Sequence, residues 1–129
     1  DSVLSRGLGD VYKRQPTYHT NVLMFITNKF AGICFDSIYD SKNLLSNIEK
    51  THKILYLSIE QVKNFSGNAI VVRNINNEAK FLISSSGLKA LDLIQKRFIE
   101  KYYDIVDINI PTIEKIGGGS VRCMVLELF

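Results

Sequence analysis

One cysteine stands where the chain could do covalent chemistry. Cys123 comes shortly after the glycine-rich residues 117–120 (GGGS), so a flexible loop leads onto a thiol near the start of an expected strand. A thiol attacks carbon as a thiolate, which needs positive surroundings, and Arg122 is a candidate source of them. Glycines let a ligand approach the backbone closely, which makes Gly119 a candidate substrate-binding residue. A lone cysteine in an apolar strand is nevertheless more often a packed core residue, and Cys34 is interpreted in that way.

A histidine occupies nearly the equivalent place at the other end of the chain. His19 comes just before an expected strand at residues 21–27. If such strands line one channel, His19 and Cys123 could form the pair that nucleophilic catalysis requires, with the imidazole as general acid and base. His52, at the end of an expected helix, is better explained as a helix cap. The glycine run matches neither GxGxxG nor GxxxxGK[ST], so it does not predict a phosphate site.

The elements that must position these residues follow one order twice. Hydrophobic runs, turn residues and capping patterns predict them in this sequence: strands at 21–27 and 30–35, a helix at 41–51, a strand at 53–58 and a short helix opened by Ser58 and Gln61. The second copy has strands at 68–73 and 79–84, a helix at 86–103 and a strand at 104–110. After Pro111 and a glycine-rich link, residues 121–129 begin the order a third time.

The repeated unit is therefore ββαβ, in an α/β chain. Asn21 and Asn68 open corresponding first strands, 47 residues apart, and Ser120 stands 52 residues further on. A period of this size is typical of architectures whose units bury their faces against neighbours. In a radial arrangement the first strands would line a central channel, and a ring of about five units would need roughly 250 residues. An ordinary α+β sandwich that reuses one unit is the alternative.

Composition excludes several classes of protein. The 129 residues are 46% hydrophobic and 22% charged, which predicts at most one globular domain. The net charge of +3 is small and scattered, so no nucleic-acid partner is expected. No apolar run is long enough to span a membrane, and two cysteines fit neither a disulfide framework nor a zinc-ligand spacing. We expect a cytoplasmic protein that acts on a small molecule, with no membrane partner, no metal and no cofactor.

The first fifteen residues have a different character. Residues 1–15 carry neither helical nor strand periodicity, and residues 5–15 (SRGLGDVYKRQ) resemble the translation of an adaptor used in sequencing libraries. We therefore expect residues 1–15 to be a non-native tail and residues 16–129 to be a C-terminal fragment of a longer protein.

Three segments carry a specific family resemblance. Residues 113–124 (IEKIGGGSVRCM) resemble the C-terminal nucleophile segment of the amidinotransferase/arginine deiminase (pentein) superfamily, and residues 18–22 (YHTNV) resemble its histidine segment. The likeness extends over residues 16–129, includes residues 64–68 (NFSGN), and is greatest to the citrulline-utilisation hydrolases, an arginine-deiminase-related branch. The resemblance implies part of a five-bladed α/β propeller built from ββαβ units.

The resemblance also implies a reaction. Cys123 would attack the central carbon of a guanidino or ureido group, and His19 would protonate the leaving nitrogen and then activate water. Asn21 stands where arginine deiminases carry an aspartate, and an amide suits a neutral ureido group at least as well as a cation. The expected parent is thus a metal-independent C–N hydrolase acting on citrulline or a related compound.

Other functions stay open. The parent could be an amidinotransferase or an arginine deiminase, or a non-catalytic propeller that serves as a binding module. Substrate-binding carboxylates in relatives come mostly from blades that this chain would lack. We therefore expect the 129-residue chain alone to be inactive, and to be aggregation-prone or to depend on self-association as a homo-oligomer.

Overall fold

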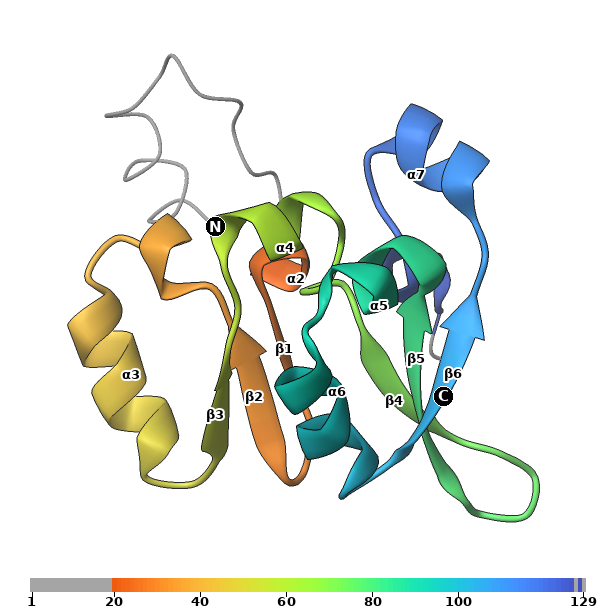
Figure 1. The fold of residues 1–129 in the computed structure, drawn as a ribbon. Helices are drawn as coiled ribbons and strands as arrows, with labels where there is room; N and C mark the ends of the chain where they lie inside the picture. Colours follow the sequence, from red (N-terminus) through yellow and green to blue (C-terminus); the bar gives the residue numbers. More distant parts are fainter. Residues whose placement is uncertain (1–19, 127, 129) are drawn as a thin grey trace.

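Two three-stranded sheets lie side by side in the computed structural model, which describes residues 20–126 and 128 (Figure 1). Each sheet has its strands in chain order, the first pair antiparallel and the second pair parallel. This arrangement is the predicted ββαβ unit, present twice. Within the described residues the two sheets do not close into a propeller, and no helix there is long and apolar enough to cross a membrane.

The first repeat surrounds the sheet β1–β2–β3. Its elements are α2 (Thr20–Leu23), β1 (Met24–Ile26), β2 (Phe30–Ile33), the 3-10 helix η1 (Phe35–Ser37), α3 (Ser41–Glu49), β3 (Lys53–Tyr56) and α4 (Ile59–Lys63). The predicted capping box is confirmed at the start of α4, where the Ser58 hydroxyl accepts from the backbone N–H of Gln61 and the Gln61 side chain accepts from that of Ser58.

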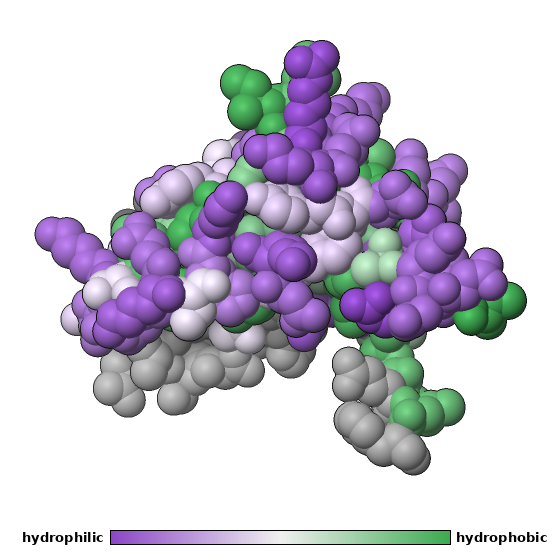
Figure 2. Space-filling view, turned by 90° about the horizontal axis from the view of Figure 1, so that it is seen from below, coloured by the Kyte–Doolittle hydropathy of each residue, from purple (hydrophilic) through white to green (hydrophobic). Residues whose placement is uncertain are grey.

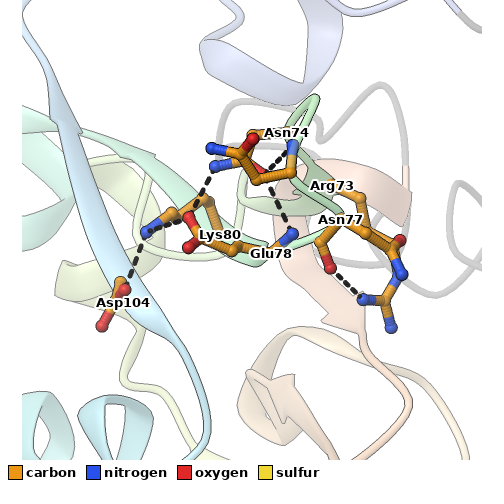
Figure 3. A network of polar contacts seen from close by, with 7 residues as sticks. Arg73, Asn74, Asn77, Glu78, Lys80 and Asp104 are labelled. Atoms are coloured by element: carbon orange, nitrogen blue, oxygen red, sulfur yellow. Dashed lines mark hydrogen bonds and ion pairs between the residues drawn. The ribbon is translucent and has the colours of Figure 1, made fainter.

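The second repeat surrounds the sheet β4–β5–β6. Its elements are β4 (Ile70–Arg73), β5 (Ala79–Ser84), α5 (Ser85–Ala90), α6 (Leu93–Glu100), β6 (Asp104–Ile108) and α7 (Pro111–Gly117), followed by the 3-10 helix η2 (Val121–Met124). The connection between β4 and β5 is a polar turn in which the side-chain oxygen of Asn74 accepts two backbone N–H groups, those of Asn76 and Glu78 (Figure 3).

The predicted strand at 21–27 is wrong in its first half. Residues Thr20–Leu23 form the short helix α2, and β1 covers only Met24–Ile26. A short apolar run fits a buried helical turn as well as a strand, so periodicity alone does not distinguish them.

The predicted strand at 121–129 is also wrong. Val121–Met124 form η2, and residues 125, 126 and 128 have no regular secondary structure. Cys123 therefore lies on a 3-10 turn and not on a strand that opens a third unit.

Two helical regions of the second repeat differ from the sequence prediction. The helix expected at 86–103 is divided, because Leu91 is extended and Asp92 begins α6 by accepting from the backbone N–H of Gln95. The glycine-rich link contains α7, which begins at Pro111, a favourable first helical residue. It ends at Gly118 in the left-handed conformation, with φ of 71°.

Both repeats share one core, centred on Phe30 of β2. This strand is buried at all four positions. The Phe30 ring lies 5.0 Å from that of Phe98 in α6 and 6.3 Å from that of Phe81 in β5, centroid to centroid. Cys34 is fully buried in the same cluster, as predicted, with its sulfur 3.3 Å from the Ser37 hydroxyl. The aromatic contacts therefore bind the two sheets to one another.

Polar groups cover much of the surface. The face seen from below is largely hydrophilic, with separate apolar patches among the polar ones (Figure 2). On the sheet of the second repeat, Lys80 forms an ion pair with Asp104 at 2.7 Å between the ammonium nitrogen and a carboxylate oxygen (Figure 3). This exposed pair lies between neighbouring strands, and hydrogen bonding to Asp104 raises the pKa of Lys80.

Candidate functional site

Cys123 is exposed, and its sulfur accepts a hydrogen bond from a buried side-chain amide. It lies on η2, and the Asn68 side-chain nitrogen donates a hydrogen bond to its sulfur over 3.2 Å. The oxygen of the same amide accepts from the backbone N–H of Arg122 over 3.0 Å. Asn68 is fully buried, so a group fixed in the interior meets a thiol at the surface. Cys123 is thus not the packed core residue that its type alone favours.

The loop before Cys123 has an internal brace. The Ser120 hydroxyl donates to a carboxylate oxygen of Glu114 over 2.6 Å, and both side chains are buried. This bond links α7 to η2 across the glycines. A Cβ added at Gly119 would lie 3.0 Å from the Cys123 sulfur, so the glycine leaves room for the thiol. The predicted contact of Gly119 with a substrate stays a prediction.

The turn that carries Asn68 also receives the start of the first repeat. A Cβ added at Gly67 would lie only 2.5 Å from the carbonyl oxygen of Val22 in α2, so this close approach requires glycine. Phe65 in the same turn has φ of 69°, which matches the 71° of Gly118 at the equivalent place in the second repeat. The turn at 65–68 thus contacts α2 on one side and the Cys123 segment on the other.

A pocket of about 180 Å³ lies between the start of the first repeat and η2. Its lining comes from two places far apart in the sequence: Thr20, Met24, Phe25 and Ile26 from the first repeat, and Arg122 from η2. It is smaller than pockets for drug-sized ligands, which measure roughly 300–1,000 Å³. Arg122 lines this pocket and directly precedes Cys123 in the sequence.

The other predicted site residues are only partly described. His19 and the side chain of Asn21 lie outside the described part of the chain, so their predicted roles stay predictions. Thr20, which follows His19 in the sequence, lines the pocket, as does Arg122, which precedes Cys123. In the described residues no three His, Cys, Asp or Glu side chains gather as metal ligands.

Two polar residues of the site did not emerge as site residues from the sequence. Asn68 lies within residues 64–68, one of the segments that carry the family resemblance. It also stands at the position in the second repeat that Asn21, a predicted site residue, occupies in the first, and this correspondence could have identified it. No sequence pattern indicates Glu114. Its side chain meets its partner Ser120 only because the chain turns back at the glycines after α7.

The model of one family, described as N,N dimethylarginine dimethylhydrolase, eukaryotic, matches residues 5–129. No curated protein matches the chain. The matched family lies within the superfamily that the sequence segments resemble, but it is not the citrulline-utilisation branch.

Proposed function

Because the chain belongs to the N,N dimethylarginine dimethylhydrolase family, we propose that it carries the cysteine nucleophile of a hydrolase that cleaves a guanidino C–N bond of an N-methylated arginine. Membership makes the chain one of a family of hydrolases of arginine derivatives. The methylated substrate and the role of Cys123 are the proposal.

One observation carries the proposal. The residue after His19 and the residue before Cys123, Thr20 and Arg122, line the same small pocket. Cys123, the residue after Arg122, is exposed and follows the loop that Ser120 and Glu114 brace. Covalent catalysis needs a nucleophile and a general acid/base that reach one ligand, and a shared pocket between the two segments supports that arrangement.

The proposed reaction has two steps. The Cys123 thiolate attacks the central guanidinium carbon and forms a C–S bond, while His19 donates a proton to the departing amine as the C–N bond breaks. Water then gives a proton to His19 and attacks the same carbon, and the C–S bond breaks to restore the thiolate. N,N-dimethylarginine would thereby yield dimethylamine and citrulline.

A neutral ureido substrate such as citrulline is a second candidate. It is favoured by Asn21, an amide at the position where arginine deiminases carry an aspartate. A carboxylate pairs with a guanidinium through charge-assisted hydrogen bonds, whereas an amide both donates and accepts. Arginine would be the substrate of a deiminase, and a glycine or other amine acceptor would be needed by an amidinotransferase.

The test uses protein expressed from the complete reading frame. It is incubated separately with N,N-dimethylarginine, arginine and citrulline, and dimethylamine, citrulline, ammonia and ornithine are measured. We expect dimethylamine release that C123S abolishes and that C34S, which changes the other thiol, leaves in place. Release of ornithine from citrulline would favour the second candidate. Tight binding without turnover of any of the three would replace the hydrolase with a binding module.

The 129 residues alone are proposed to lack turnover. Carboxylates match a guanidinium head group through paired hydrogen bonds, and Glu114, in the helix α7 before Cys123, is buried and already hydrogen-bonded to Ser120. Dimethylamine release by this chain alone, at a rate comparable to that of the complete protein, would contradict this statement.

A further inference from the structure

We infer that Asn68 is a positioning residue for Cys123, which holds the thiol-bearing segment through its oxygen and favours the thiolate through its nitrogen. Its importance for catalysis rests on the proposed function, whereas its effect on the sulfur can be measured without turnover.

The side-chain contacts of Asn68 with Arg122 and with Cys123 determine each other. The backbone N–H of Arg122 can only donate, so the amide oxygen must face it at 3.0 Å. An amide is planar, and its nitrogen therefore faces the other way, where the Cys123 sulfur lies at 3.2 Å. The orientation of the amide is thus fixed by chemistry, and the sulfur receives a hydrogen. Such a hydrogen bond is stronger to an ionised acceptor than to a neutral one, which favours the thiolate.

The place of the amide is fixed by the buried turn from which it extends. The backbone N–H of Asn68 donates to the carbonyl of Phe65 over 3.1 Å, and the Ser66 hydroxyl donates to the carbonyl of Gly87 over 2.8 Å. Ser66, Gly67 and Asn68 are all buried. Cys123, in contrast, is exposed on its 3-10 turn, which follows three glycines. The buried turn therefore fixes the position of Asn68, and the hydrogen bonds of Asn68 position the exposed Cys123 segment.

The charged groups around the thiol do not offer the same directed contact. Arg122 lies on the same turn and lines the pocket. The strand packed against η2 is β5, and its lysine, Lys80, is paired with Asp104. The side-chain N–H of Asn68 is consequently a directed polar contact to the sulfur that neither of these cations replaces.

The experiment measures alkylation of Cys123 in this 129-residue chain. Wild type, N68D and N68A are treated with iodoacetamide from about pH 6 to about pH 10, a range that spans ordinary thiol ionisation. The adduct on the Cys123 peptide is followed by mass spectrometry. The peptide of the fully buried Cys34 is the internal control, because its labelling reports unfolding.

Direct action on the sulfur and a purely structural role predict opposite orders. The ionised carboxylate introduced by N68D still accepts from the N–H of Arg122, but it gives no hydrogen to the sulfur and repels a thiolate. Direct action therefore predicts that N68D is alkylated more slowly than N68A, about tenfold more slowly than wild type near neutral pH, with a profile displaced to higher pH. If Asn68 only holds the backbone, N68D keeps the wild-type rate and profile and N68A departs further. That result would overturn the inference.

Two further measurements keep the result independent of folding losses. S66A removes an equally buried side chain of the same turn, and we expect it to lower the melting temperature without changing the pH profile of alkylation. In unmodified wild type, the side-chain amide ¹⁵N resonance of Asn68 should shift with pH over the range in which the alkylation rate rises. A resonance that stays constant over that range would contradict direct contact with the ionising sulfur.

Failure of this inference and failure of the proposed function are distinguishable. A complete protein that hydrolyses no guanidino compound, with an Asn68-dependent alkylation profile, would refute only the hydrolase. In an active complete protein, N68D should lower kcat much more than it changes KM. Turnover that stays at the wild-type kcat in N68D would refute only the positioning role.

Discussion

Gln61 and Gln95 donate hydrogen bonds to each other across the two repeats. The Gln61 nitrogen lies 2.7 Å from the Gln95 oxygen, and the Gln95 nitrogen lies 3.1 Å from the Gln61 oxygen. Each glutamine is also the third residue of a capping box, so its oxygen accepts from the backbone N–H of Ser58 or Asp92. The starts of α4 and α6 are thereby joined through one pair of side chains.

A double-mutant cycle on these glutamines should show coupling. Q61A and Q95A each remove a cap contact and one half of the pair, so either change alone should destabilise the chain by about 1–2 kcal/mol. The double variant should lose less than the sum, by about 0.5–1 kcal/mol, because the pair can be lost only once. Urea unfolding of the four proteins measures these energies. Strict additivity would mean that the two amides do not interact.

Substitution at Gly67 should disturb the contact between α2 and the turn that carries Asn68. In G67A the new methyl group would meet the backbone oxygen of Val22, which cannot move aside as a side chain does. We expect a loss of about 1–3 kcal/mol in the free energy of unfolding. G117A is the matched control, since a Cβ at Gly117 has nothing within 4 Å. Equal stability of G67A and wild type would show that α2 does not pack there.

The brace between Ser120 and Glu114 should stabilise the loop before the thiol. S120A removes the hydroxyl that donates to the buried carboxylate, which should cost about 1–3 kcal/mol. E114Q keeps an acceptor oxygen of the same shape and should cost less. Hydrogen exchange of residues 117–123 should accelerate in S120A and change little in S37A, which alters another serine far from this loop in the sequence. Unchanged exchange in S120A would show that the loop is held by other contacts.

The ion pair of Lys80 gives a pH dependence whose sign can be stated. Hydrogen bonding to Asp104 raises the pKa of Lys80 above its usual value of 10.5. The folded state therefore holds the proton more tightly than the unfolded state, and the contribution to stability is present below pH 10.5 and lost as the pH rises through the folded-state pKa. Wild type should melt at a slightly higher temperature than K80M near pH 8, with the difference vanishing in strongly alkaline buffer. A difference that grows with pH would contradict the pairing.

Local patterns sufficed for some elements of the fold, but contacts between distant residues decided others. The spacing of Ser58 and Gln61 predicted the capping box, and the alternation at 104–110 predicted β6, because both depend on neighbours in the chain. The apolar residues at 121–129 also suggested a strand. Val121 is instead buried in a 3-10 turn, and the backbone N–H of Arg122 bonds to Asn68, 54 residues away. No spacing within the segment reports such a partner.

The candidate site, like the fold, could be predicted from the sequence only where local patterns determine it. The glycine run and the residue type predict Cys123 as a candidate nucleophile, and the structure places it at the surface, next in sequence to the pocket residue Arg122. The pairing of Cys123 with His19 stays a prediction. The amide of Asn68 could not be assigned from the sequence, because an asparagine in a turn can also bond to its own neighbouring backbone, and its partners here lie 54 and 55 residues away.

The aromatic contacts around Phe30 have a consequence for dissection of the molecule. This ring receives Phe81 and Phe98 from the second half of the chain, while Phe25 from the first half lies 5.1 Å from Phe81. A cut in the turn at 64–69 would leave each half with one side of these ring pairs facing water. Although the sequence resembles a tandem of similar modules, the two modules share their aromatic interior, and a chain nicked in this turn would stay folded only as long as both pieces remained associated.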